Sequence, residues 1–123
     1  MTLQELYASI DGNFEQAQRI MRMEKRISRH LGKFEASKLD ESLRAAAENL
    51  DAKALFESTH AMKGVCGNLG LEKLCEMASE LSEEFRPGTA RALSDEQVKQ
   101  KIDALLALYD RTVEAIRRYA AEQ

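Results

Sequence analysis

His60 is the residue in this chain best placed to do chemistry, because it shares one stripe of a predicted helix with Lys63, Gly64 and Gly67. Residues at this spacing lie on the same side of an α-helix. A free imidazole nitrogen can act as a nucleophile toward phosphorus. The ammonium of Lys63 can offset the charge of a transferred phosphoryl group. The stripe therefore suits a histidine that another protein must reach.

The two glycines of the stripe are unfavourable inside a helix, by about 1 kcal/mol each relative to alanine. Gly64 and Gly67 leave nothing bulky beside His60 on one side, and they would let a partner's loops approach the helix backbone. The alternative interpretation is that the glycines serve close packing between helices and that His60 is an ordinary polar residue at the edge of the core. The spacing alone favours neither interpretation.

The residues around His60 also resemble a known family. Thr59 to Gly64 read T-H-A-M-K-G, and Leu69 and Gly70 follow. This segment resembles the histidine-containing phosphotransfer (HPt) domains of phosphorelays, whose pattern is roughly A-H-x-L-K-G followed by L/I-G. Thr59 and Met62 replace the usual alanine and leucine. The likeness is strong over about residues 43–85 and only architectural outside them, and it favours the phosphoacceptor interpretation of His60.

The resemblance implies a phosphorelay intermediate. His60 would take a phosphoryl group from a receiver-domain aspartate, usually on Nε2 in the family, and pass it to another receiver. Lys63 would steady the phosphoryl oxygens, and Gly64 and Gly67 would admit the receiver. The implied partners are response-regulator receiver domains and a hybrid sensor histidine kinase. Mg²⁺ would belong to the receiver, and this chain would bind no cofactor or metal and would have no ATP-dependent kinase activity.

A helical adaptor that binds a receiver or kinase without carrying phosphate is the alternative function. An adaptor has no need of an accessible imidazole beside a lysine, so His60 discriminates between the two functions.

Other chemistry has little support, since the chain has no glycine-rich phosphate loop. Cys66 and Cys75 are not spaced as C-x-x-C and are expected to be buried free thiols. Glu57 and His60 have the E-x-x-H spacing of a bundle metal site, but no second copy occurs.

The composition is that of a soluble helical protein, with one Pro, six Gly and no Trp among 123 residues. This length suits one domain over residues 1–123, and we expect a monomer. The formal net charge of −3 argues against general nucleic-acid binding. No apolar run approaches the ~20 residues that span a membrane, and no secretory signal is present. We therefore expect a cytoplasmic protein, and Met1 with the predicted first helix favours a free-standing one.

Apolar residues at helical spacing predict an all-α fold. We expect an antiparallel four-helix bundle with a short N-terminal helix capping one end, which is also the architecture of HPt domains. Capping boxes at Thr2 and Ser94 and caps at Asp51 and Gly70 mark helix ends. The helical spacing of the apolar residues is interrupted between Gly32 and Lys38, which predicts a kink or a short break. The predicted helices are Thr2–Ile10, Phe14–Phe34 with an extension over Leu39–Asn49, Asp51–Leu69, Leu71–Phe85 and Ser94–Ala120.

Charged and titratable residues on the predicted Phe14–Phe34 helix raise three further points. Its basic stripe is more consistent with a solvated face that pairs with acidic neighbours than with a docking surface, and the acidic Leu71–Phe85 helix would complement it. Glu24 falls within the apolar face, so it lies either at the bundle end near Lys63 or in solvent. His30, among basic residues, is expected to be a surface histidine. The stripe consists of Arg19, Arg22, Arg26, Arg29 and Lys33.

Overall fold

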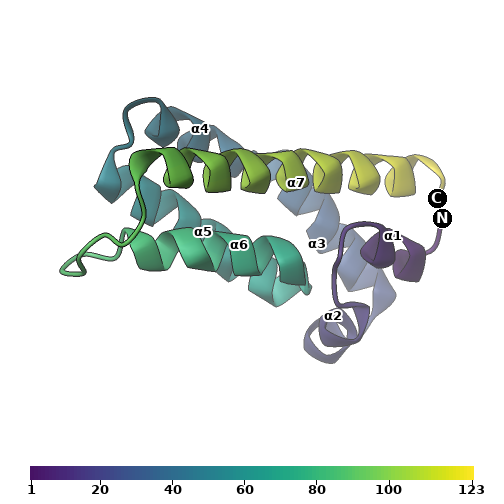
Figure 1. Ribbon diagram of the computed structural model, residues 1–123. Helices are drawn as coiled ribbons and strands as arrows, with labels where there is room; N and C mark the ends of the chain where they lie inside the picture. The colour runs from purple at the N-terminus through teal and green to yellow at the C-terminus, as the bar shows by residue number, and fades with distance from the viewer.

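Seven helices and no strands make up the computed structural model, which describes residues 1–123 (Figure 1). Helices α3 and α4 together, α5, α6 and α7 form the predicted four-helix bundle, and α1 and α2 cover one end of it (Figure 1). The chain termini lie side by side, and the Met1 amino group is 2.7 Å from Glu122 Oε1. The helices are α1 Leu3–Ser9, α2 Phe14–Met21, α3 Glu24–Ser37, α4 Asp40–Asn49, α5 Ala52–Leu69, α6 Glu72–Glu84 and α7 Asp95–Ala121.

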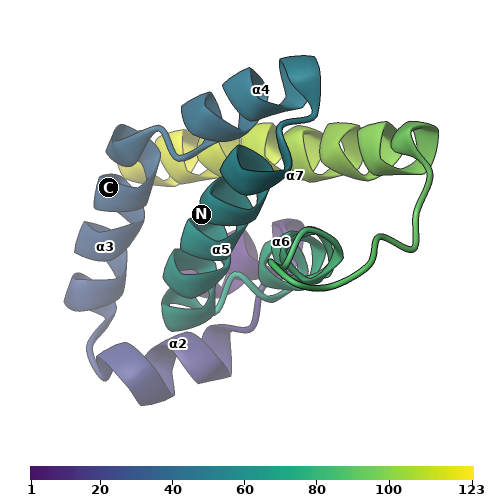
Figure 2. The ribbon, with the colours of Figure 1, turned by 90° about the vertical axis from the view of Figure 1, so that its left-hand side faces the viewer.

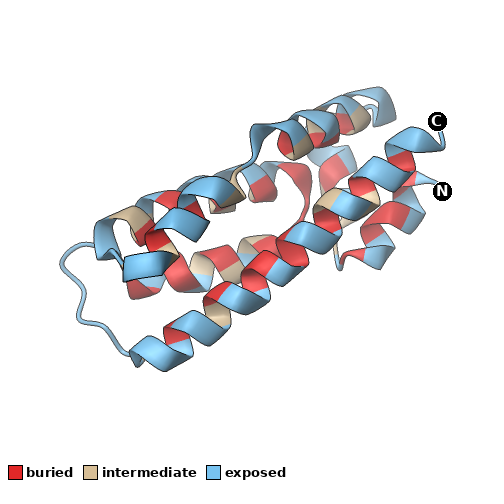
Figure 3. Ribbon diagram, turned by 90° about the horizontal axis from the view of Figure 1, so that it is seen from above, coloured by how far each residue is buried: buried red, intermediate tan, exposed pale blue.

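The predicted capping boxes are both present. Thr2 accepts a hydrogen bond from the Glu5 amide at the start of α1, and Ser94 accepts one from the Gln97 amide at the start of α7. In each box the Glu or Gln side chain accepts in return from the cap backbone. The apolar seam of α7 is buried along its whole length (Figure 3). It consists of Val98, Ile102, Leu105, Tyr109, Thr112, Ile116 and Tyr119.

The prediction of one continuous helix over Phe14–Phe34 is wrong. The chain breaks at Arg22, where φ is 70°, and α3 starts afresh at Glu24. The break has a physical reason, because one straight helix would place Glu24 between Met21 and Ile27 on the buried face. Instead Glu24 is exposed in the first turn of α3, where a carboxylate is favourable beside the helix N-terminus. This position also settles the two alternatives for Glu24 in favour of solvent.

The interruption of the helical spacing after Gly32 corresponds to a second break. Lys38 adopts the left-handed conformation with φ of 52°, and α4 begins at Asp40. The buried residues Phe34 and Leu43 therefore both face the core although they lie on separate helices. The predicted helix over Leu39–Asn49 is confirmed within one residue, and it is a separate helix rather than a bent continuation of α3.

The acidic residues of α6 do not pair with the basic stripe, so this prediction is also wrong. Figure 2 shows α3 and α6 on opposite sides of α5, too far apart to meet. The α6 carboxylates bind nearer cations instead. Lys101 Nζ lies 2.9 Å from Glu80 Oε2, Lys73 lies 4.0 Å from Glu76, and Arg86 pairs with Glu83.

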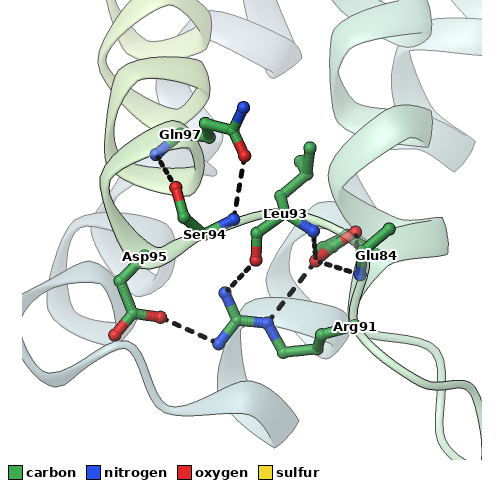
Figure 4. A network of polar contacts seen from close by, with 7 residues as sticks. Glu84, Arg91, Leu93, Ser94, Asp95 and Gln97 are labelled. Atoms are coloured by element: carbon green, nitrogen blue, oxygen red, sulfur yellow. Dashed lines mark hydrogen bonds and ion pairs between the residues drawn. The ribbon is translucent and has the colours of Figure 1, made fainter.

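Glu84, the last residue of α6, is buried and holds the loop that leads to α7 (Figure 4). Its Oε2 accepts hydrogen bonds from the backbone amides of Ala92 at 3.1 Å and Leu93 at 2.9 Å. Arg91 Nε lies 3.5 Å from the same oxygen, and the Arg91 guanidinium lies 4.8 Å from the centre of the Phe85 ring. These contacts hold the loop between α6 and α7 against the end of α6.

Removal of the Glu84 carboxylate should destabilise the protein measurably. Glu84→Ala is expected to lower the free energy of unfolding by about 1–3 kcal/mol, because two backbone amides and a guanidinium lose their acceptor. Urea denaturation measures this change. Glu83→Ala is the matched control. The Glu83 carboxylate is exposed and should contribute little to the free energy of unfolding. Equal stabilities of the two variants would contradict the role given to Glu84.

Candidate functional site

Helix α5 carries the predicted site, and its ends are fixed by the residues that the sequence indicated. The Asp51 side chain accepts a hydrogen bond from the Ala54 amide at 3.2 Å, and Gly70 ends the helix with φ of 70°. A Cβ atom at Gly70 would lie 2.5 Å from the Asn13 carbonyl oxygen, so the backbones of α5 and α2 meet there too closely for a side chain. Both predicted caps of α5 are confirmed.

The C-terminal end of α5 is also tied to the N-terminal helices. The Asn13 amide donates to the Gly70 carbonyl at 2.7 Å, and the buried Tyr7 hydroxyl donates to the Leu69 carbonyl at 2.7 Å. Burial raises the pKa of Tyr7, so its phenol keeps its proton and remains a donor. These bonds hold α5 in one position relative to α1 and α2, with one face in the core and the other toward solvent.

His60 lies on the exposed face of α5. The protein makes no hydrogen bond or ion pair to either nitrogen of its ring. The ring stacks on Phe56, one turn earlier, with centroids 5.3 Å apart and planes 21° apart. The imidazole is thus free to react on its nitrogen atoms while one of its faces is covered.

His30 is in a different situation from His60. It is half-buried rather than a free surface residue, and its Nδ1 lies 2.9 Å from the Arg26 carbonyl oxygen. It therefore has one ring nitrogen engaged by its own helix. The expectation of a surface histidine is corrected in this respect.

Lys63 lies one turn after His60 and is half-buried, and its ammonium forms no ion pair. Its charge lies close enough to Cys75 on α6 to act on that thiol. Its backbone carbonyl accepts a hydrogen bond from Cys75 Sγ at 3.5 Å, which joins this turn to α6. The structure therefore leaves the Lys63 charge available to an anion near His60.

The two glycines of the stripe have different surroundings. A Cβ atom at Gly64 would meet nothing within 4 Å, so close helix packing does not explain this glycine. A Cβ atom at Gly67 would lie 3.7 Å from Cys75 Sγ, which is an ordinary contact in the groove between α5 and α6. The space beside His60 is therefore open at Gly64 and bordered by α6 at Gly67.

A hollow of about 590 Å³ lies between α2, α3 and α5, on the C-terminal side of His60. Its walls are largely apolar, and two of the three large hydrophobic side chains exposed on the protein, Ile20 and Val65, line it. This hollow was not predicted from the sequence. Its lining residue Val65 comes directly after Gly64, which the sequence placed in the candidate site. The other lining residues are Met21, His30, Lys33, Phe34, Ser37, Leu39, Asn68 and Leu69.

The basic stripe on α2 and α3 is exposed and forms no ion pair with the rest of the protein. The expected pairing with acidic neighbours is therefore absent, and the positive charge is open to solvent. Lys33 belongs both to the stripe and to the wall of the hollow. A largely apolar hollow with one unpaired cation, Lys33, in its wall thus adjoins the helix that carries His60.

The thiols of Cys66 and Cys75 are free, as predicted. Cys66 is buried and Cys75 is half-buried, and burial raises the pKa of both. Nearby Lys63 opposes this effect at Cys75 only in part. No group of three or more His, Cys, Asp or Glu side chains is arranged to hold a metal ion, and no helix has the length and apolar character needed to cross a membrane.

Comparison with known proteins gives one match. The family described as Hpt domain matches the chain over residues 2–115, which includes six of the helices and most of α7. No curated protein and no solved structure matches the chain.

Proposed function

The chain belongs to the Hpt domain family, which has a phosphotransfer role in two-component signalling, and from this premise we propose that His60 is its phosphoacceptor. The observation that carries the proposal is the state of this side chain. His60 is exposed, free of hydrogen bonds, next to an unpaired lysine and beside open space at Gly64. His30 lacks this combination, because it is half-buried and its Nδ1 lies 2.9 Å from the Arg26 carbonyl oxygen.

The proposed reaction is a displacement at phosphorus. The unprotonated ring nitrogen of His60 forms a bond to the phosphorus of an aspartyl phosphate in a receiver domain. The bond between that phosphorus and the aspartate oxygen breaks, and the aspartate leaves as a carboxylate. The Lys63 ammonium would lie near the phosphoryl oxygens and stabilise their charge. The reverse reaction with a second receiver would pass the group on.

The receiver would dock over α5 and the adjoining hollow. Gly64 gives its loops access to the α5 backbone, and Gly67 continues this access along the α5–α6 groove. The apolar walls around Ile20 and Val65 would supply the desolvated centre of the interface. The free cations of the basic stripe would face the acidic pocket of the receiver and speed the encounter.

The remaining parts of the proposal concern the source of the phosphoryl group, the metal ion, the location of the protein and its oligomeric state. A hybrid sensor histidine kinase would supply the phosphoryl group through its receiver, and Mg²⁺ would be bound by the receiver and not by this chain. Residues 1–123 would act as one HPt unit, as a cytoplasmic monomer without kinase activity of its own. A non-phosphorylated adaptor could use the same hollow and cations, but it would not depend on His60.

Incubation with a phosphorylated receiver tests the proposal. Receiver domains from a panel are labelled with radioactive acetyl phosphate, freed of the donor and mixed with the protein in the presence of Mg²⁺. We expect label to move from at least one receiver to this chain, and no label to appear with radioactive ATP alone. Stable binding to a receiver without any transfer would support the adaptor instead.

Substitution of Lys63 should slow transfer without abolishing it. Lys63→Ala is expected to lower the transfer rate roughly tenfold, because a charge-assisted contact contributes about 1.5–3 kcal/mol when well formed and solvent reduces that value. The half-life of the phosphohistidine should also fall, while Lys63→Arg should keep most of both values. Unchanged rates and half-lives in both variants would make Lys63 an ordinary solvated lysine.

A further inference from the structure

Phe56 is the aromatic side chain that stacks on the His60 ring. The two rings stack with centroids 5.3 Å apart and planes 21° apart. Side chains on a helix lean toward its N-terminus, so His60 lies over the preceding turn, which carries Phe56, and away from the open side at Gly64. No hydrogen bond holds either ring nitrogen, and the stack restricts the orientation of the imidazole.

Phe56 is itself anchored. It is half-buried and packs against the hydrophobic core. Its ring also lines a second hollow, of about 450 Å³, together with Phe85 and Pro87 near the end of α6. Contact with the core therefore restrains the Phe56 side chain on which the His60 ring stacks.

The near-parallel stack suits the chemistry proposed for His60. The lone pair of an unprotonated imidazole nitrogen lies in the plane of the ring, so a partner on the ring face leaves it free. A ring that turned freely about its side-chain bonds would spend part of its time with this lone pair directed away from a phosphoryl donor. We propose that Phe56 is a positioning residue that holds the His60 imidazole ready for attack, an inference that rests on the proposed function of His60.

A small phosphoryl donor separates positioning from docking. With phosphoramidate, the unprotonated His60 nitrogen forms a bond to phosphorus, the phosphorus–nitrogen bond of the reagent breaks, and ammonia leaves with its electron pair. The phosphorylated ring then loses a proton to water. This reaction needs no receiver, so any effect of Phe56 on it acts through His60 alone.

The experiment compares phosphoramidate labelling of the wild-type chain with Phe56→Leu, Phe56→Tyr and the control Phe14→Leu. Leucine keeps an apolar side chain against the core but cannot stack, and tyrosine keeps the ring. Phe14 is another half-buried aromatic residue, which packs against Tyr7 on the distant α1. Phe56→Leu should lower the labelling rate roughly two- to tenfold, the range expected when one ordered side chain is released. Phe56→Tyr and Phe14→Leu should label at the wild-type rate.

Proton resonances of the His60 ring give a readout that a purely structural role would not move. The Phe56 ring should shift them upfield in the wild type and in Phe56→Tyr, and they should move downfield in Phe56→Leu. A wild-type labelling rate in Phe56→Leu, or an equal loss in all variants, would overturn the inference. Failure of every receiver to transfer phosphate would contradict the proposed function, whereas a Phe56-dependent rate with phosphoramidate would still support the positioning role.

Discussion

His60→Gln should abolish acceptance of a phosphoryl group from a receiver while leaving the protein folded. Glutamine keeps a polar side chain of similar length but has no nucleophilic nitrogen. His60 is exposed and forms no hydrogen bond, so little packing is lost with the imidazole. Transfer of label from a phosphorylated receiver measures the effect, and circular dichroism confirms the unchanged helical content.

His30→Gln is the matched control for this variant, because His30 is the only other histidine in the chain. At a saturating receiver concentration it should still be labelled to completion, even though His30 lines the hollow and could influence affinity. Label on His60→Gln, or its loss from His30→Gln, would show that His60 is not the acceptor.

Gly64→Leu should weaken receiver docking by at least about tenfold, because a leucine side chain would fill the space that a partner must enter. The same change should stabilise α5 by up to about 1 kcal/mol, since leucine is a better helix former than glycine. Nothing lies within 4 Å of the new Cβ, so the first atom of the side chain meets no neighbour that would offset this gain. Titration with a receiver gives the affinity, and thermal unfolding gives the stability.

Gly32→Leu is the control for Gly64→Leu. Gly32 is also a helical glycine at which a Cβ atom would meet nothing within 4 Å, and it lines neither hollow. The Gly32→Leu variant should gain stability in the same way and keep its affinity for the receiver. A collapse of the melting temperature in Gly64→Leu would instead mean that Gly64 packs inside the bundle.

The parts of the fold that were predicted from sequence are those encoded by local contacts. Asp51 and Gly70 bound α5 through hydrogen bonds and backbone angles within a few residues of themselves, so the pattern of residue types was enough. The capping box at Ser94 and the apolar seam of α7 are equally local. The stripe that contains His60 follows directly from helix geometry once these ends are fixed.

The break at Arg22 was not predicted, because arginine carries no sequence signal for a positive φ. The one available sign was Glu24, which a continuous helix would have buried. Tertiary packing determines the outcome, since α2 packs against α5 while α3 turns toward α7. The apolar hollow depends on this break, so it too could not be predicted from the separate helices.

Long-range contacts explain the other differences. Nothing in the sequence distinguishes Glu84 from the other acidic residues of its helix, but the loop from Arg86 to Leu93 returns and covers it. The stack of Phe56 on His60 had a visible signal, because the two residues are spaced by one helical turn. Spacing alone does not say that the two rings stack, and only the structure places the Phe56 ring against the imidazole.

The most direct test of the central claim is to locate the phosphate that the chain receives from a receiver. After transfer, the protein should carry an acid-labile, base-stable phosphate, and mass spectrometry under non-acidic conditions should place it on His60. A second, unphosphorylated receiver added afterwards should remove it. An acid-stable phosphate, a phosphate on any other residue, or no phosphate from any receiver of the panel would contradict the account.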